Sequence, residues 1–302
     1  MSAQPLWIAH RERGTRSLIS VIVRLTLVLG RPVGRALLYP ICTYFVLFSR
    51  GAREASRDYL ERVLQRRPRW RDLLRHHLCF ARTILDRVYL LTGRLEYFDC
   101  TVEGVDALRA CVAQRQGCLL FGAHFGSFDL LRVLGLAECP VPVHVLMHQR
   151  HAEKLNAVLG ALNPGSPMQV IRLGQPQTML QVAEALSRGE IVALLADRVV
   201  AGDKMVPCNF LGEHTLLPGG PFALAAMLRA PVVLFSAVYQ GGRSYRIRFE
   251  PFAERVVLPR ERRDAALRAY CQRYAEWLEE KCRFAPYNWF NFYDFWGHGR
   301  AR

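Results

Sequence analysis

From about residue 97 onward, short apolar runs alternate with stretches of helical periodicity, and this alternation constrains the fold more than any other feature of the chain. The runs have the length of buried strands, and the stretches between them repeat apolar residues three and four positions apart. Strands that alternate with helices form one sheet whose faces the helices cover. The sequence therefore predicts an α/β fold with a mixed central sheet flanked by helices.

The expected elements follow from the turn residues between the runs. Strands are expected at residues 97–103, 118–124, 141–147, 168–173, 190–197, 231–239 and 244–252. Helices are expected near residues 105–115, 127–136, 153–162, 178–189, 221–230 and 262–283. The last two strands flank Gly241 and Gly242, which are typical of an antiparallel hairpin turn, so the sheet is expected to be mixed. The segment between residues 197 and 221 is expected to be a long loop.

Positive charge is concentrated in the N-terminal third. The whole chain has a formal net charge of +15, and residues 1–94 hold 18 arginines, six acidic residues and no lysine. Residues 51–92 show the pattern of two basic amphipathic helices separated near Pro68. A basic surface beside apolar helices favours contact with anionic lipid headgroups or with an acidic carrier protein. We therefore predict two parts, a membrane-associated helical region at 1–94 and an α/β domain at 95–302.

Residues 17–48 are largely apolar but are interrupted too often for a single membrane span. The longest run without charge, residues 36–49, is shorter than the roughly 18–20 residues that cross a bilayer. Pro32 and Pro40 are expected to break any single helix. The segment predicts one or two helices in the membrane interface, with arginines reaching lipid phosphates and basic flanks that stay cytoplasmic. A buried helical hairpin of a soluble protein remains the alternative.

Two of the expected strands end in unusual polar sequences, GAHFGSFD at residues 122–129 and ADRVVAGD at residues 196–203. In α/β sheets, ligands bind at the carboxyl ends of strands. The imidazole of His124 can take a proton from a hydroxyl as a general base, with Asp129 holding its other ring nitrogen. In the alternative interpretation, Asp129 only caps the following helix and His124 is a satisfied polar residue. The spacing alone leaves both interpretations open.

Other chemistries have little support in the sequence. Ser127 lies in no GxSxG motif, so a hydrolase nucleophile is not expected there. The nine cysteines are scattered without a CxxC pair, which predicts a reducing compartment and neither disulfides nor zinc. His144, His148 and His151 have no cysteine or carboxylate that completes a ligand set, so no metal site is expected.

The residues from His124 to Asp129 form the HxxxxD motif of the lysophospholipid acyltransferase superfamily. Their surroundings resemble the bacterial branch that contains the lauroyl and myristoyl acyltransferases of lipid A biosynthesis, through GAHFGSFDLLRVLG, LLADRV and VPCNFLGEHTLLPGGPFALA. More narrowly, WIAHRERGTRSLI, GRPVGRALLYPICTYF and APYNWFNFYDFW resemble the subgroup found with aryl-polyene or xanthomonadin-type pigment clusters. The resemblance covers most of the chain and implies a fold like that of glycerol-3-phosphate acyltransferase.

The resemblance also implies roles for particular residues. His124 would be the catalytic base and Asp129 its orienting partner. Substrate contacts would come from a basic residue after the third strand, an acidic–basic pair, an aromatic–glycine block and a proline before the next helix. These residues are Arg150, Asp197, Arg198, Asn209, Phe210, Gly212 and Pro218. The amides that follow, at Gly219 and Gly220, would open a helix and help to hold an anion.

The expected function is therefore acyl transfer. An acyl group would move from an acyl-carrier-protein or CoA thioester to a hydroxyl of a lipid, glycolipid or pigment-headgroup acceptor. The enzyme would need no other cofactor and would lie on the cytoplasmic face of a bacterial inner membrane, peripheral or monotopic. The alternatives are a non-catalytic binder of anionic membranes or nucleic acid, and an acyl-thioester hydrolase on the same fold. No nucleic-acid-binding motif is legible, so a nucleic-acid partner is not expected.

The C-terminal stretch PYNWFNFYDFW carries seven aromatic side chains within residues 287–296. Such a stretch can pack on the core, with its indole and phenol groups finding partners at the rim. It can also form an aromatic belt at a membrane interface beside an acyl channel. The sequence does not separate these two interpretations.

Overall fold

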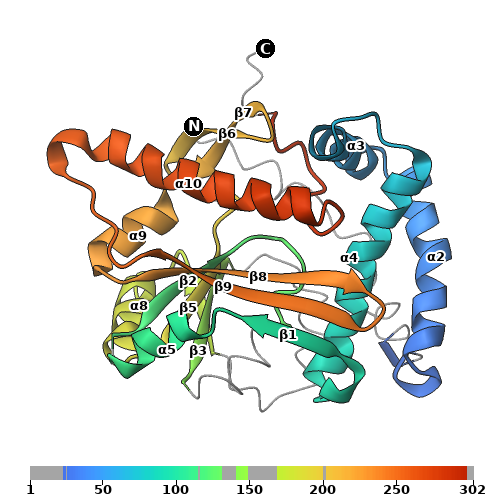
Figure 1. The fold of residues 1–302 in the computed structure, drawn as a ribbon, viewed down its shortest axis with the longest axis horizontal. Coiled ribbons are helices and arrows are strands. Elements are labelled where there is room, and N and C mark those ends of the chain that lie inside the picture. The colour runs from blue at the N-terminus through green and yellow to red at the C-terminus, as the bar shows by residue number, and fades with distance from the viewer. Residues whose placement is uncertain are drawn as a thin grey trace.

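Seven strands form one central sheet in the computed structural model (Figure 1). The structure describes residues 23, 24, 26–114, 116–130, 141–148, 169–199 and 202–297. The strands are β1 (Asp99–Glu103), β2 (Cys118–Gly122), β3 (Val143–His148), β4 (Gln169–Leu173), β5 (Ile191–Leu195), β8 (Val232–Gly241) and β9 (Ser244–Ala253). Their order across the sheet is β1-β9-β8-β2-β5-β3-β4. Only β8 and β9 pair antiparallel, so the sheet is mostly parallel and the expected mixed α/β fold is confirmed.

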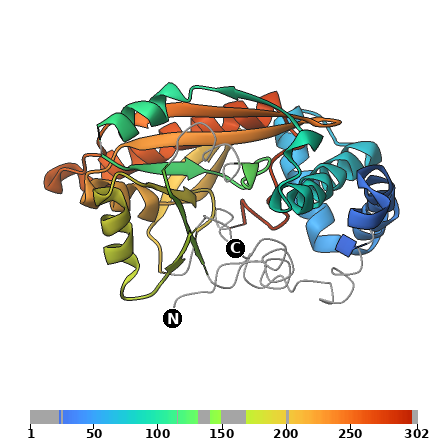
Figure 2. The same ribbon diagram turned by 90° about the horizontal axis from the view of Figure 1, so that it is seen from below.

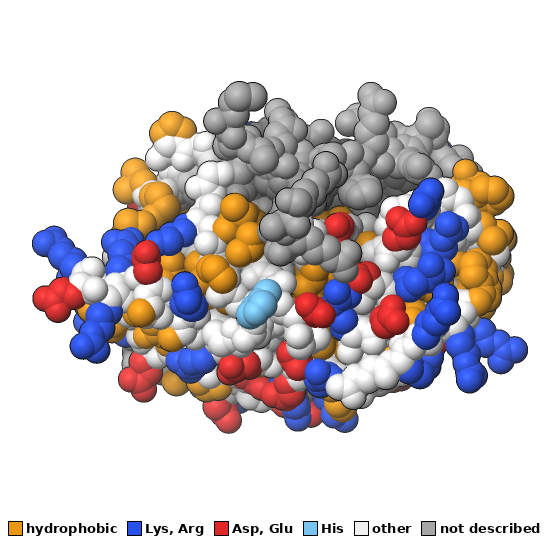
Figure 3. All heavy atoms as spheres, turned by 90° about the horizontal axis from the view of Figure 1, so that it is seen from above, with side chains coloured by type: hydrophobic (Ala, Val, Ile, Leu, Met, Phe, Trp, Pro, Cys, Tyr) orange, Lys and Arg blue, Asp and Glu red, His pale blue; other side chains and the backbone are white. Residues whose placement is uncertain are grey.

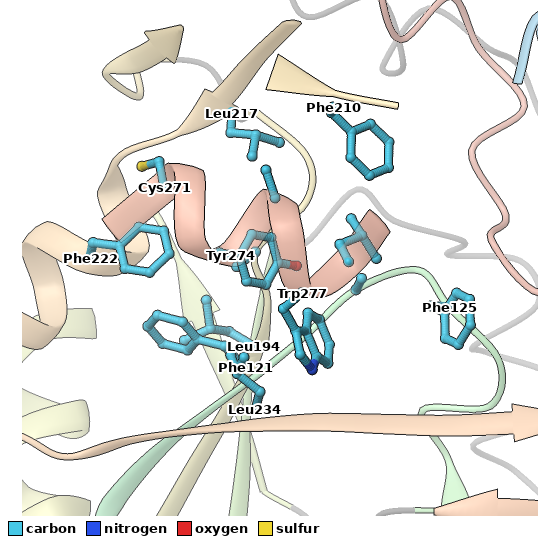
Figure 4. Close-up of a cluster of buried hydrophobic side chains, with 14 of the residues drawn as sticks. Phe121, Phe125, Leu194, Phe210, Leu217, Phe222, Leu234, Cys271, Tyr274 and Trp277 are labelled. Atoms are coloured by element: carbon cyan, nitrogen blue, oxygen red, sulfur yellow. The ribbon is translucent and has the colours of Figure 1, made fainter. Parts of the chain in front are cut away.

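Both faces of the sheet are buried, which explains why its strands are continuous apolar runs. Along β2, Leu119 and Phe121 join the core on one face, whereas Leu120 joins the core on the other. The helices over these faces are α5 (Asp106–Ala113), α8 (Thr178–Ser187), α9 (Gly220–Leu228) and α10 (Arg263–Phe284). Figure 4 shows Tyr274 and Trp277 of α10 packed over Phe121 of the sheet. The expected helix at 153–162, and most of that at 127–136, lie outside the described residues.

The segment expected to be a long loop contains a two-stranded hairpin instead. It is formed by β6 (Met205–Phe210) and β7 (Glu213–Pro218), which pair antiparallel. Pro207 within the first strand hides the pattern, since proline cannot donate to a strand ladder and is confined to edges. The turn at Leu211 and Gly212 has positive φ at both positions, 53° and 82°, as tight hairpins require.

Three N-terminal helices stand together at the end of the sheet toward which β8 runs (Figures 1 and 2). They are α2 (Arg31–Phe48), α3 (Arg50–Leu64) and α4 (Trp70–Leu91), so the pair expected within residues 51–92 is confirmed. Pro32 falls in the first turn of α2, where its missing N–H costs nothing. The expectation that Pro40 breaks the segment is wrong, because α2 continues through it with the proline on the exposed side.

The arginines of α2 point into the protein. The guanidinium of Arg31 forms two hydrogen bonds of 2.7 Å with Asp86 of α4, and both side chains are buried. Arg35 lies 3.5 Å from the same carboxylate and donates to the Tyr239 hydroxyl at 2.7 Å. The Tyr245 hydroxyl donates to Asp86 at 2.8 Å. The expectation that these two arginines reach lipid phosphates is therefore wrong, because the buried carboxylate of Asp86 competes for them.

The outward face of α2 is apolar as a consequence. Its exposed side chains include Val33, Leu37, Tyr39, Tyr44, Leu47 and Phe48, with Phe48 64% exposed. Hydrophobic side chains gather on this edge of the molecule next to basic ones (Figure 3). Among the described residues, no helix by itself has the length and apolarity of a membrane span, although α2 and α3 taken together, bent by 93°, do.

Replacing Asp86 with alanine is expected to detach α2 from α4. Removing one partner of a buried ion pair leaves the other charge uncompensated, which costs about 3 kcal/mol or more. The free energy of unfolding, measured with urea, should fall by about that amount. Glu54→Ala is the control, since its ion pair with Arg50 is exposed to solvent and adds little to stability. Equal losses in the two variants would contradict the structural role of Asp86.

Candidate active site

The turn after β2 carries His124 to the carboxyl edge of the sheet. Gly126 has φ 67°, and the backbone amide of the next residue, Ser127, donates to the Ala237 carbonyl of β8 at 2.9 Å. A Cβ on Gly126 would lie only 1.8 Å from that carbonyl oxygen, so only glycine allows the turn to approach β8 this closely. The turn is therefore clamped against the sheet directly beside His124.

The carboxylate that contacts His124 is Asp197, at the end of β5. Strands β2 and β5 are parallel neighbours that pair Gly122 with Leu195, so residues two positions further on lie side by side. Nδ1 of His124 is 2.7 Å from one oxygen of Asp197, and the backbone amide of His124 donates to the other at 3.1 Å. A carboxylate only accepts, so Nδ1 carries the proton and Nε2 is the basic nitrogen.

Asp129 does not have the predicted position. Its carboxylate forms an ion pair of 2.7 Å with Arg87 of α4, and Nδ1 of His124 donates to Asp197 instead. The parallel register of β2 and β5 explains the difference, because it fixes Asp197 next to the imidazole whereas the turn carries Asp129 toward the helices. The expectation that Asp129 holds the imidazole nitrogen is corrected accordingly. Arg87 was not predicted from the sequence.

The C-terminal segment 287–296 completes the surroundings of Asp197. The indole Nε1 of Trp289 donates to its second oxygen at 3.1 Å, and the amide of Asn291 donates to the same oxygen at 2.9 Å. The segment is packed inside, since Trp289 is fully buried and Phe290, Tyr293, Phe295 and Trp296 are each at most 8% exposed. The packed interpretation of this stretch is confirmed, and these side chains do not form an exposed belt.

The same segment joins the turn to the N-terminal helices. The Phe290 amide donates to the His124 carbonyl at 2.7 Å, so the backbone of the C-terminal segment is bonded directly to the turn after β2. The Trp289 carbonyl accepts from Nε2 of His76 in α4 at 2.7 Å. His76 is fully buried, and its Nδ1 accepts from the Ser56 hydroxyl of α3 at 2.8 Å. In Figure 2 the C-terminal segment runs between the sheet and the three helices.

The electrostatics suit a neutral base beside an ionised carboxylate. Burial and the Arg198 guanidinium lower the pKa of His124, against the opposing attraction of Asp197. Burial alone would raise the pKa of Asp197, but His124, Arg198 and the Asn291 hydrogen bond outweigh it and hold that pKa well below its usual range. At neutral pH the imidazole is therefore unprotonated and able to accept a proton, as general-base catalysis requires.

Among the predicted substrate contacts that the structure describes, Arg198 lies directly beside this pair. Its Nε donates to Asn291 at 2.6 Å and its Nη2 to the Phe290 carbonyl at 3.0 Å. The guanidinium also lies 5.6 Å from the ring centroid of Tyr293. Asp197, also predicted as a substrate contact, instead has both its oxygens occupied by protein donors.

The other predicted substrate contacts have different surroundings. Phe210 is buried against the tail, with its ring centroid 5.2 Å from that of Trp289, whereas Asn209 is exposed. Gly212 forms the hairpin turn, and Pro218 ends β7. The amide of Gly220 at the start of α9 donates to Asp203 at 2.8 Å, so this carboxylate already occupies the position expected for an anion. Arg150 lies outside the described residues.

No group of residues suited to holding a metal ion occurs in the part of the chain that the structure describes. His144 is buried and bonds to Glu190 at 2.6 Å through Nε2, which gives it a structural partner. The side chain of His148 and all of His151 lie outside the described residues.

Sequence reasoning missed Trp289, Asn291 and His76. The signal available was the pair of asparagines inside an aromatic run, because buried amides need partners and so mark a polar contact within the core. Trp289 and Asn291 both contact Asp197, which lies 92 and 94 residues earlier in the chain, so spacing along the sequence could not identify them.

Comparison with known proteins adds the family. Among curated proteins, none matches the chain. Residues 8–297, nearly the whole chain, match the family described as bacterial lipid A biosynthesis acyltransferase. The match spans the turn with His124, the end of β5 and the aromatic tail. The chain therefore belongs to the bacterial lipid A biosynthesis acyltransferase family.

Proposed function

We propose that this protein transfers an acyl group from a thioester, carried by acyl carrier protein or CoA, to a hydroxyl of a lipid acceptor. The observation that carries the proposal is the hydrogen bond of 2.7 Å between Nδ1 of His124 and Asp197 at the carboxyl edge of the sheet. It fixes the tautomer in which Nε2 is the base, and family membership supplies the reaction class.

The reaction follows from this tautomer. Nε2 of His124 removes the proton of the acceptor hydroxyl while the hydroxyl oxygen attacks the carbonyl carbon of the thioester. The tetrahedral intermediate then expels the thiolate, which takes the proton back from the imidazolium. Asp197 stabilises the transient imidazolium and stays ionised throughout. No acyl group is attached to the protein, so no nucleophilic serine is needed.

The finer identity of the substrates extends the same proposal. The resemblance to the aryl-polyene subgroup favours an acceptor among glycolipids or pigment headgroups, and a donor that carries an aliphatic or polyene acyl chain. The basic N-terminal helices favour an acidic carrier protein and anionic lipids as partners. The proposed location is the cytoplasmic face of a bacterial inner membrane. The N-terminal region 1–94, and not the α/β domain, would make the contact with the bilayer.

His124→Ala and Asp197→Asn are expected to lower kcat by about 100-fold or more. The first removes the base, and the second replaces a carboxylate that only accepts by an amide that stabilises the imidazolium less well. Release of free thiol from an acyl thioester, with mass spectrometry of the acylated lipid, measures turnover. Ser127→Ala, on the same turn, is the control and should keep its activity. Full turnover in His124→Ala would overturn the mechanism, and free fatty acid as the product regardless of acceptor would identify a hydrolase.

The apolar face of α2 is expected to insert into lipid. Val33, Leu37, Leu47 and Phe48 are exposed beside arginine-rich helices, an arrangement that binds anionic interfaces. Changing Leu47 and Phe48 together to aspartate should lower the fraction of protein that floats with phosphatidylglycerol vesicles several-fold. Met227→Asp is the control, since Met227 is as exposed as Phe48 and α9 lies at the opposite end of the molecule from α2 (Figure 1). Absence of the wild-type protein from vesicles at low salt would contradict this interpretation.

A further inference from the structure

One buried amide touches both charged groups beside His124. Asn291 is 2% exposed. Its Nδ2 donates to Asp197 at 2.9 Å, and its Oδ1 accepts from Nε of Arg198 at 2.6 Å. An amide side chain offers a donor and an acceptor on one planar group, so the two neighbours also define which way the amide is turned.

Asn291 lies between opposite charges that are consecutive in the chain. No ion pair between Asp197 and Arg198 occurs among the described residues, although both side chains contact the same amide. The guanidinium is turned away to Asn291 and to the Phe290 carbonyl. One oxygen of Asp197 thereby faces Nδ1 of His124, and the other accepts from the His124 amide, Trp289 and Asn291. The amide therefore stands between the two charges and takes the place of a direct ion pair.

We propose that Asn291 is a positioning residue of the active site, which directs Asp197 to His124 and holds Arg198 apart from it. This inference rests on the proposed function for its effect on turnover, but its effect on the imidazole is independent of any reaction. Trp289 supports the same arrangement through its indole bond to Asp197.

Three neighbouring tyrosine and cysteine groups stay neutral around this site, so they do not obscure the test. Tyr274, Tyr293 and Cys282 all sense the charge of Asp197, and burial raises the pKa of each of them. Burial and Arg198 lower the pKa of His124, so its change of charge is followed from neutral pH downward.

Asn291→Asp tests the assignment, because it keeps the shape and places a second carboxylate next to Asp197. The added negative charge favours the imidazolium, so the pKa of His124 should rise by about one unit or more. Selective 13C labelling of histidine and NMR titration measure this shift, with the His124 signal assigned by its loss in His124→Ala. If the variant turns over, the acid limb of its kcat/KM profile should move to higher pH by the same amount.

Asn288→Asp is the matched control. Asn288 is buried three positions earlier in the same segment, and its amide bonds to the backbone of Tyr239 rather than to Asp197. The same change in charge there should leave the His124 titration within a few tenths of a unit of wild type. Circular dichroism shows whether each variant folds.

Asn291→Ala serves if the aspartate variant does not fold. It removes both hydrogen bonds without adding a charge, and it should lower kcat about tenfold with KM unchanged within twofold. A His124 titration in Asn291→Asp that superimposes on wild type would overturn the inference, as would a tenfold rise in KM at unchanged kcat in Asn291→Ala. Full turnover in His124→Ala beside a shifted titration in Asn291→Asp would overturn the proposed function alone.

Discussion

The buried carboxylate of Asp197 is the group around which the candidate active site is built. An ionised carboxylate without water is costly, and it persists only where protein donors replace its hydration. Here those donors come from the turn after β2 and from the C-terminal segment, which are far apart in sequence. The need to satisfy one charge thus brings together the sheet edge and the tail, and the tail in turn binds α4 through His76.

A second buried carboxylate, Asp86, organises the N-terminal helices in the same way. It draws Arg31 and Arg35 of α2 inward and accepts from Tyr245 of the β8–β9 hairpin. The apolar side of α2 then has no place except outside. A helix with buried arginines and exposed leucines is unusual at a surface that faces water. The proposed membrane contact is therefore placed on the outward face of α2.

Much of the fold could be predicted because its signals are local. All seven strands of the sheet were expected from apolar runs bounded by turn residues. The position of His124 at the edge of the sheet was expected because it follows one of these strands. The hairpin at residues 205–218 was missed because Pro207 disguises its first strand. The partner of His124 was also missed, because the choice between Asp129 and Asp197 depends on the register between β2 and β5, which is a property of the sheet and not of spacing along the chain.

The position of the tail has a consequence for how the protein is made. Asn291 contacts a residue 94 positions earlier, so the surroundings of His124 remain incomplete until synthesis has passed this point. A nascent chain with both polar strand ends already folded would still lack the groups that fix the imidazole. A premature stop codon between the end of α10 and Trp289 would leave every residue of the HxxxxD motif in place. It would still remove two of the donors that replace water around Asp197, and with them the support for an ionised carboxylate beside His124.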